Sequence, residues 1–388
     1  MSRVDNQRRL FLELTEELRP WWRRDPGLPQ RLNAWLARHR SGSRDRRLYR
    51  ELAYTSWRIL PWIEDASPDR IIEQVAQFAA PSKATSSFIE AYKTSESITV
   101  PAPADSLLPD WLSRECPAAL GPLQRDALLR RAPLWIRLQT AQPHSVAAEL
   151  NDLGIAHHPS GLNNFADAWR IDGEPNLLTT RSHVRGHFEI QDIGSQALLT
   201  SLADRPQGRW LDACAGAGGK TLQLARLLGP HGHVTAQDVR GEALREFEKR
   251  ADRAGLTNVE VERVPDGQFD GVLLDAPCSG SGTWRRSPHL KWTTTPATLQ
   301  RAAEKQHFVL DTFAPRVAPG GLLVYATCSL CHSENAAVIE SFLETHPEFR
   351  AVPLRHPSTG TEIPTGQLSL LPADLDSDGY FVACLRRT

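Results

Sequence analysis

The chain has 388 residues, of which 40% are hydrophobic and 23% charged, and its 45 Lys and Arg balance 46 Asp and Glu to a net charge of −1. This length suffices for two or three domains, and the composition is ordinary for a water-soluble globular protein. No stretch approaches the 18 apolar residues of a membrane span and the N-terminus has no signal-peptide pattern, so we expect a cytoplasmic protein without a membrane partner.

Residues 1–80 combine apolar and charged residues at helical spacing, which predicts an all-helical domain. Residues 1–60 hold 14 Arg and no Lys against 7 Asp and Glu, a local excess of +7. Such an excess belongs either to solvated helix faces or to a basic face for an RNA backbone. Residues 80–108 are rich in Ser, Pro and Ala and predict a linker. We therefore expect an N-terminal helical RNA-binding domain plus linker over 1–108.

A smaller α/β module is expected over 109–182. Two short helical patterns come first, and then residues 133–140 have the apolar pattern of a strand. Residues 145–154 predict a helix and residues 164–171 another strand. We assign this module to RNA binding as well.

From residue 183 to residue 388 short apolar strands alternate regularly with helices. This alternation predicts a parallel, Rossmann-like α/β sheet with helices on both faces. The expected strands are 209–213, 233–238, 259–264, 269–276 and 321–328, and the expected helices are 219–228, 240–254, 297–316 and 333–345.

The segment 211–221, LDACAGAGGKT, joins the first of these strands to its helix. A Walker phosphate loop would need glycine where the chain has Cys214, and a dinucleotide fingerprint would need glycine in place of Thr221. A glycine turn remains, with Asp238 22 residues after Gly216, the spacing at which a carboxylate binds a ribose. S-adenosylmethionine (AdoMet) has a ribose but no pyrophosphate, so we predict an AdoMet site rather than a plain strand–turn–helix connection. Its predicted residues are Cys214, Ala215, Gly216, Ala217, Gly218, Gly219, Lys220, Asp238 and Asp275.

Two cysteines follow neighbouring predicted strands. Asp275 and Cys278 end one strand and Cys328 ends the next, so all three should meet at the carboxyl edge of the sheet. A single buried cysteine usually only packs, but a pair beside an AdoMet loop suits methylation of a pyrimidine carbon. One thiolate would add to carbon 6 of an unstacked base, an acid such as Asp275 would support the ring's polar edge, and a base would remove the carbon-5 proton. From the spacing alone the two cysteine roles are interchangeable.

A metal site is not expected. Cys328 and Cys331 have the spacing of a zinc-binding pair, but no second pair of ligands accompanies them. The six cysteines are too scattered to indicate a disulfide framework.

These motifs together resemble the Sun-type (NOL/NOP/Sun) RNA cytosine-5 methyltransferases, whose bacterial members modify 16S ribosomal RNA. The resemblance covers about 130–388, and residues 45–58 are similar to the NusB-like helical domain of the ribosomal-RNA branch. It implies an AdoMet-dependent enzyme that forms 5-methylcytosine, with Cys328 as the nucleophile and Cys278 assisting product release. The segments that carry it are LDACAGAGGKT, LLDAPCSGSGTWRRSPHLKW, LVYATCSL, DSDGYFVACL and GHFEIQDIGSQAL.

The chain departs from the family's pattern at two points. The family's loop usually has Cys-Ala-Ala-Pro-Gly-Gly-Lys, so Ala217 replaces a proline, a change expected to loosen the turn. The family also places an acid for the adenine after its third strand, and here Asp266 is the one obvious counterpart, unless it is simply a turn residue. RNA phosphates and bases are expected to face Arg285, Arg286, Lys291 and Trp292, for which a solvated loop is the other interpretation.

Two further functions remain open at this stage. The same catalytic core could modify transfer RNA, or the altered loop could leave a catalytically silent RNA-binding assembly factor. A DNA methyltransferase would leave Cys328 unexplained, and an NAD enzyme fits the loop least. We expect a monomer, and the modified nucleotide cannot be named from the sequence.

Overall fold

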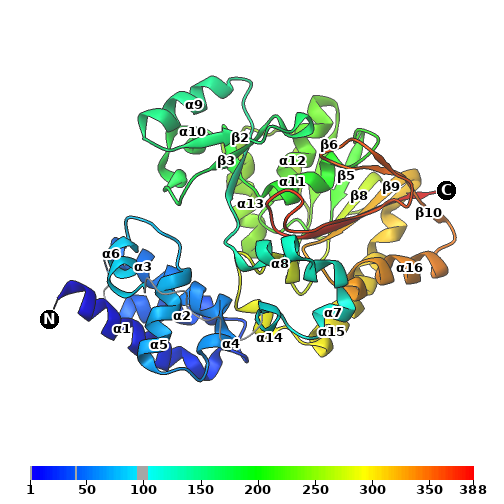
Figure 1. Ribbon diagram of the computed structural model, residues 1–388. Coiled ribbons are helices and arrows are strands. Elements are labelled where there is room, and N and C mark those ends of the chain that lie inside the picture. The colour runs from blue at the N-terminus through cyan, green and yellow to red at the C-terminus, as the bar shows by residue number, and fades with distance from the viewer. Residues whose placement is uncertain (1, 40–41, 94–103) are drawn as a thin grey trace. The chain divides into compact units, whose positions relative to one another are not determined.

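The computed structural model describes residues 2–39, 42–93 and 104–388 (Figure 1). Within it the chain forms two compact units, Met1–Arg131 with Thr283–Pro296, and Ala132–Gly282 with Ala297–Thr388. These two units do not coincide with the expected divisions after residues 108 and 182, which stay predictions. Part of the predicted linker, residues 94–103, lies outside the described residues.

The first unit is helical, as predicted. Its opening helix begins with a reciprocal cap in which the Ser2 hydroxyl accepts from the Asp5 amide and the Asp5 carboxylate accepts from the Ser2 amide. Its helices are α1 (Arg3–Leu18), α2 (Leu28–Arg38), α3 (Ser43–Arg58), α4 (Leu60–Ile63), α5 (Pro68–Phe78), α6 (Ser86–Tyr92), α7 (Leu112–Glu115), α8 (Pro122–Leu129) and α14 (Leu290–Thr293).

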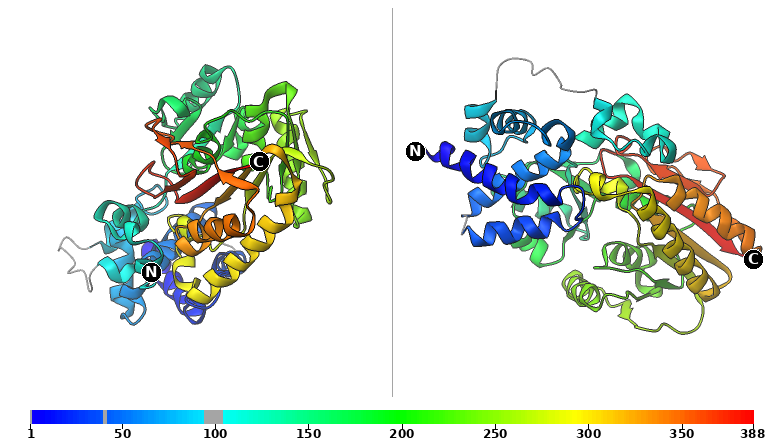
Figure 2. Two further views of the ribbon diagram at one scale, coloured as in Figure 1. Left: turned by 90° about the vertical axis from the view of Figure 1, so that its right-hand side faces the viewer. Right: turned by 90° about the horizontal axis from the view of Figure 1, so that it is seen from below.

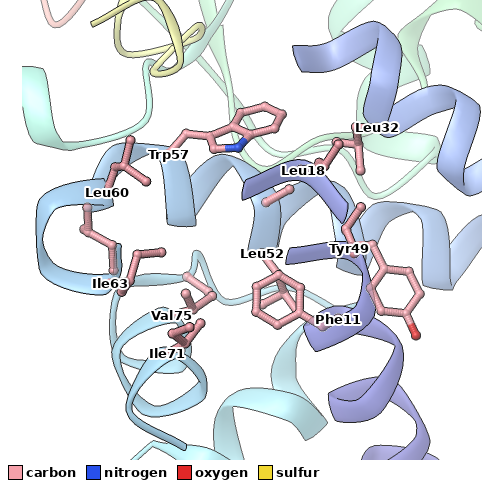
Figure 3. Close-up of a cluster of buried hydrophobic side chains, with 14 of the residues drawn as sticks. Phe11, Leu18, Leu32, Tyr49, Leu52, Trp57, Leu60, Ile63, Ile71 and Val75 are labelled. Carbon is pink, nitrogen blue, oxygen red and sulfur yellow. The ribbon is translucent and has the colours of Figure 1, made fainter. Parts of the chain in front are cut away.

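Apolar side chains at helical spacing face the interior of this unit. Phe11, Leu14 and Leu18 share one stripe of α1, and Leu48 and Leu52 share one stripe of α3. Figure 3 shows these stripes meeting side chains from α2, α4 and α5 in one cluster. The tryptophans at 35, 57, 62 and 292 lie on α2, α3, α4 and α14 and are buried, as is Trp22 between α1 and α2, whereas Trp21 is exposed.

The second unit contains a small antiparallel sheet of order β2-β3-β1-β4. The strands expected at 133–140 and 164–171 are present as β1 (Leu134–Leu138) and β3 (Ala168–Ile171). β2 (His157–Pro159) and β4 (Phe188–Ile190) were not foreseen, and β4 lies beyond the expected boundary at 182 although it pairs with β1. The helices of this region are α9 (Pro143–Asp152), α10 (Arg181–Val184) and α11 (Ile193–Thr200).

The larger sheet has the strand order β10-β14-β9-β8-β5-β6-β7, with β13 also paired to β14. The five predicted strands are all present and parallel to one another, which confirms the Rossmann-like α/β expectation. They are β5 (Arg209–Asp212), β6 (His233–Ala236), β7 (Val259–Val261), β8 (Phe269–Asp275) and β9 (Val317–Thr327), connected by α12 (Gly219–Leu228), α13 (Gly241–Ala254) and α15 (Pro296–Phe313), with α16 (Ala336–Thr345) following β9.

The strands' alternating side chains build a core on each face of this sheet. Trp210 and Leu273 pack with α11 and α12 on one face, whereas Leu211 and Leu274 pack with α15 and α16 on the other. Figures 1 and 2 show these two helix layers with the sheet between them.

An antiparallel addition completes the sheet beyond β9. β14 (Tyr380–Arg387) pairs with β9 from Phe381–Thr327 to Arg386–Leu322, and β10 (Phe349–Ala351) and β13 (Gln367–Leu370) flank it. β11 (Leu354–Arg355) and β12 (Glu362–Ile363) form a separate hairpin. Among the described residues no helix is both long and apolar enough to cross a bilayer.

The helical core supplies a stability test. Leu52 is fully buried on α3, so Leu52→Ala should lower the free energy of unfolding by about 2–5 kcal/mol through lost burial and an unfilled cavity. Urea denaturation followed by tryptophan fluorescence measures it. Leu123 on α8 is 79% exposed, and Leu123→Ala should stay within about 0.5 kcal/mol of wild type. Equal effects of the two substitutions would contradict the assigned core.

Candidate active site

The functional side chains collect where the large sheet reverses its strand order. β5 pairs with β6 on one side and with β8 on the other, so the loops after these strands separate at their carboxyl ends. Asp212 ends β5, Asp275 ends β8 and Thr327 ends β9, one residue before Cys328. The topology therefore brings together the three segments that the sequence analysis selected.

The glycine loop after β5 is held by two carboxylates. Asp212 accepts hydrogen bonds from the Thr221 hydroxyl at 2.7 Å and the Cys214 amide at 3.3 Å, and its burial raises its pKa to about 7. Asp238, which follows β6, accepts from the Gly216 amide at 2.8 Å. Gly216 and Gly218 have φ values of 54° and 85°, a conformation that favours glycine over other residues.

Asp238 has a second partner that the sequence analysis did not consider. Arg240 donates to its carboxylate through the backbone amide at 2.8 Å and through Nε and Nη2, each at 3.0 Å. Burial by itself would raise the pKa of Asp238, but the hydrogen bonds from Arg240 and Gly216 outweigh burial and lower it. Asp238 is thus held as a carboxylate beside the loop, in the form that accepts hydrogen bonds from ribose hydroxyls.

Lys220 and Asp275 form an ion pair between the first helical turn of α12 and the end of β8. The Lys220 Nζ lies 2.7 Å from Asp275 Oδ2, and the Lys220 side chain is 11% exposed. Burial lowers the pKa of Lys220, but the charge of Asp275 and its hydrogen bond outweigh burial and raise it. Lys220, predicted only as a cofactor residue, therefore places a positive charge next to the cysteine loops.

The two predicted cysteines are neighbours in space. Their Sγ atoms lie 3.3 Å apart, at hydrogen-bonding distance. The hydrogen bond from Cys278 lowers the pKa of Cys328 and outweighs its burial, and the positive charge of Lys220 acts in the same direction as that hydrogen bond. The same hydrogen bond, and then burial, raises the pKa of Cys278. The thiolate is therefore favoured on Cys328 and the proton on Cys278, an asymmetry that the spacing did not determine.

A buried carboxylate, Glu334, joins the two cysteine loops. It accepts from the Ser279 amide and hydroxyl at 2.7 and 2.5 Å, and from the Ser329 hydroxyl at 2.5 Å. Gln306 on α15 donates to Glu334 at 3.2 Å and to the Pro277 carbonyl at 3.0 Å. Sequence reasoning missed Glu334 and Gln306, although Glu334 lies only six residues after Cys328.

The loop that leads into β14 contacts the two cysteine loops through main-chain hydrogen bonds. The Gly282 amide donates to the Cys328 carbonyl at 2.9 Å, and the Gly379 amide donates to the Gly282 carbonyl at 2.8 Å. A Cβ atom on Gly282 would lie 2.1 Å from the Gly379 carbonyl oxygen, so only glycine fits there. The segment DSDGYF, which leads into β14, thereby acquires a structural role at the site.

Asp266 does not lie at the site. Its side chain is fully exposed, and its carboxylate pairs with Arg316, which immediately precedes β9. No helix separates β7 from β8, so the connecting residues run back along the sheet and carry Asp266 to the opposite, amino-terminal edge. The expectation that it contacts an adenine is therefore wrong, and the turn interpretation holds, because Asp266 lies beside Gly267 at a φ of 80°.

Three of the four residues predicted to face RNA are buried in the helical unit. Lys291 donates through Nζ to the carbonyls of Arg58 and Leu107, each at 3.0 Å, and burial lowers its pKa well below the usual value. Trp292 donates to the Trp57 carbonyl at 2.6 Å, and Arg285 donates to the Arg131 carbonyl at 3.1 Å. These side chains fasten residues 283–296 to the helices, which corrects their assignment to RNA contact. Arg286 is exposed, and its RNA contact stays a prediction.

Much of the arginine excess in the first unit is engaged by carboxylates. Arg23 pairs with Glu64 at 2.7 Å and Arg131 with Glu51 at 3.0 Å, while Arg8 pairs with Asp69 and Arg38 with Glu17. Arg44, Arg46 and Arg47, at the start of α3, are exposed. Fewer arginines of this unit are therefore available to contact an RNA backbone than the count in the sequence suggested.

No cluster of three metal-ligating side chains occurs within residues 2–39, 42–93 and 104–388. Cys331, considered as half of a zinc pair, is buried with its Sγ 3.4 Å from the Ser281 hydroxyl.

Comparisons with known proteins agree on one group. A family model described as 16S rRNA methyltransferase RsmB/F matches residues 199–386. The probable ribosomal RNA small subunit methyltransferase B of Synechocystis sp. is 33% identical over 306 residues, covering 72% of this chain and 66% of that protein. The protein of the same name from Bacillus subtilis is 36% identical over 298 residues, with the same coverage. The chain thus spans just under two thirds of the length of these relatives.

Solved structures show the same fold. The crystal structure titled PH0851 has a TM-score of 0.73 at 24% identity and covers 92% of this chain and 93% of its own. A methyltransferase homolog from Pyrococcus horikoshii has a TM-score of 0.57 at 26% identity, covering 68% of this chain and 89% of its own.

The role of Glu334 in joining the loops can be tested by stability. Glu334→Gln replaces one acceptor oxygen by an N–H donor, which leaves a buried hydroxyl or amide donor without its acceptor. We expect a loss of about 1–3 kcal/mol in the free energy of unfolding, measured by urea denaturation. Glu344→Gln, an exposed change on α16, is the matched control and should have an effect within about 0.5 kcal/mol. Equal values for the two variants would contradict this role.

The effect of Lys220 on Cys328 predicts a pH dependence. Lys220→Met removes a positive charge that lowers the pKa of Cys328, so that pKa should rise and the thiolate should form only at higher pH. The measurement is the alkylation rate of Cys328 by iodoacetamide against pH, followed by peptide mass spectrometry. Lys305→Met, at an exposed position of α15, should leave the profile unchanged. A Lys220→Met profile that overlays wild type would refute the electrostatic effect.

Proposed function

Because the chain belongs to the 16S rRNA methyltransferase RsmB/F family, we propose that it is an AdoMet-dependent RNA methyltransferase that forms 5-methylcytosine in 16S ribosomal RNA. The observation that carries the chemistry is the cysteine pair. Two thiols 3.3 Å apart, with opposite pKa shifts and an ammonium beside one of them, provide both a nucleophile and a proton-carrying group.

The residues of the glycine loop fit an adenosyl group. A Cβ atom on Gly219 would meet nothing within 4 Å, and one on Gly216 would approach only Arg240 Nη2, at 3.3 Å, so there is room beside the loop. Asp238 would accept hydrogen bonds from the ribose hydroxyls, either beside those that Arg240 donates to it or in their place. Residues 214–220 would line the ligand. When bound there, AdoMet supplies an electrophilic methyl group.

The first step assigned to this chain is addition of the Cys328 thiolate to carbon 6 of the cytosine. A sulfur–carbon bond forms and the carbon 5–carbon 6 double bond opens, which makes carbon 5 nucleophilic. Asp275 is assigned to the ring's polar edge, where its carboxylate would accept from the exocyclic amino group of the cytosine, while the Lys220 ammonium, 2.7 Å from that carboxylate, would offset the negative charge that develops on the ring.

Product release requires loss of the carbon-5 proton, and Cys278 is the group assigned to it. Once Cys328 is bonded to carbon, its sulfur no longer carries the charge that holds the Cys278 proton, and the pKa of Cys278 falls. After Cys278 has given its proton to solvent, its thiolate takes the carbon-5 proton. The double bond then reforms as the sulfur–carbon 6 bond breaks, which returns Cys328 to its thiolate form.

The RNA class rests on the relatives. Those compared here are named as small-subunit ribosomal RNA methyltransferases, which favours 16S ribosomal RNA over transfer RNA. The altered glycine loop left a silent RNA-binding factor open. Catalysis is supported because Lys220 is bonded to Asp275, Cys278 to Cys328, and Asp238 to the Gly216 amide of the loop.

The cysteine roles predict opposite results for two substitutions. With labelled AdoMet and 16S ribosomal RNA, Cys328→Ala should abolish methyl transfer because it removes the nucleophile. Cys278→Ala should accumulate a covalent protein–RNA adduct, because it removes the group that permits release. The measurements are label incorporation into cytosine and a denaturing gel.

Cys384→Ala is the matched control, since Cys384 is buried on β14 opposite Val324, four residues before Cys328, and the variant should methylate without accumulating adduct. An adduct that appears with Cys328→Ala instead would reverse the roles. Methylation of transfer RNA but not of 16S ribosomal RNA would reassign the substrate, and absence of AdoMet binding would favour the silent RNA-binding factor.

A further inference from the structure

Ala217 of the glycine loop is held by a side chain from another element, Arg250 of α13. Ala217 lies between Gly216 and Gly218, two glycines with positive φ, where the backbone is least restricted. Its carbonyl accepts a hydrogen bond from Arg250 Nη1 at 2.7 Å. We propose that Arg250 is a positioning residue that holds the cofactor loop in its binding shape, an inference that rests on the proposed function.

Arg250 is itself immobilised by a buried carboxylate. Its Nε and Nη2 atoms donate to Glu189 Oε2 at 3.1 and 2.8 Å. The side chains of Glu189 and Arg250 are 2% and 16% exposed. A planar guanidinium held through two nitrogens can direct its third nitrogen at a fixed point, which a flexible ammonium cannot do.

Glu189, the carboxylate that holds Arg250, belongs to the small sheet and not to the large sheet that bears the glycine loop. Glu189 lies on β4 in the small sheet, where Arg137 of β1 is opposite it in the strand register. Arg250 lies on α13. Two arginines of α13, Arg250 and Arg253, converge on this one carboxylate. Glu189 of the small sheet therefore holds Arg250 in place, and Arg250 in turn holds the Ala217 carbonyl of the glycine loop.

The helix α13 also contacts the loop one turn earlier. A Cβ atom on Gly218 would lie 2.1 Å from Phe247 Cδ2, so the aromatic ring lies directly against this glycine. Phe247 and Arg250 are three residues apart and face the same side of the helix. One restrains the loop by packing and the other by a charge-assisted hydrogen bond.

This arrangement offsets the absent proline. A proline at 217 would limit the backbone through its fixed φ, whereas alanine has no such restriction. A hydrogen bond to the carbonyl of that same residue restores the restriction by other means. A preordered loop lowers the entropy lost when a ligand binds, so the expected effect is on cofactor affinity.

Arg250→Gln should raise the Kd for AdoMet about tenfold, the size expected for one lost hydrogen bond from a charged group. Calorimetry measures this Kd, and kinetics should show KM for AdoMet rising more than kcat falls. Arg250→Lys, which cannot span both Glu189 and Ala217, should lie between wild type and Arg250→Gln.

Arg253→Gln is the matched control, because Arg253 lies on the same helix and donates to Glu189 through Nη2. It should change thermal stability by an amount similar to Arg250→Gln but leave the Kd near the wild-type value. Equal increases in Kd for the two variants, or an unchanged Kd in Arg250→Gln, would overturn the proposal.

A measurement without cofactor separates this inference from the proposed function. Amide hydrogen exchange of residues 213–219 should be faster in Arg250→Gln than in wild type and unchanged in Arg253→Gln. If wild-type protein fails to bind AdoMet, the proposed function fails while the exchange experiment still decides the role of Arg250. Unchanged exchange in Arg250→Gln would refute the loop-positioning role even in an active enzyme.

Discussion

The carboxylate of Glu334 is the constraint on which the rest of the site depends. It receives donors from the loop after β8 and from the loop after β9 at once, so the two cysteines that follow these strands are held within 3.3 Å of each other. A buried carboxylate with several donors is stable only if every donor is in place, and this requirement makes the arrangement specific. Parallel strands bring the loops to one edge, but Glu334 sets the distance between them.

Electrostatics then distinguishes two chemically identical side chains. Lys220 lies on the side of Cys328, and its ammonium and the hydrogen bond from Cys278 act in the same direction to favour a Cys328 thiolate. Asp275 keeps Lys220 charged in spite of burial. Lys220, which follows the glycine loop, thus helps to lower the pKa of the proposed nucleophile, Cys328, and also lies at the proposed cofactor site.

Local sequence patterns predicted the position of a residue correctly wherever that position follows from its own strand or helix. The parallel strands, the glycine turn and the placement of Asp238, Asp275, Cys278 and Cys328 all follow from periodicity and from the geometry of parallel sheets. Prediction failed where a side chain's direction depended on distant chain segments. Lys291 and Trp292 have the composition of an RNA-binding loop, yet their polar atoms bind main-chain carbonyls of the helical unit. Asp266 lay at an expected spacing, but the missing helix before β8 carried it to the other edge of the sheet.

The amino-acid sequence by itself determined the order and type of the catalytic strands and helices, because hydrophobic periodicity and glycine turns act over a few residues. It also determined which side chains could meet at the carboxyl edge of the sheet. Only the tertiary structure decided which cysteine favours the thiolate, because that depends first on the hydrogen bond between the two sulfurs and then on burial and the charges around Cys328. It likewise decided that Glu334 joins the loops and that Arg250 reaches Ala217, since hydrogen bonds between elements far apart in the chain depend on how those elements pack.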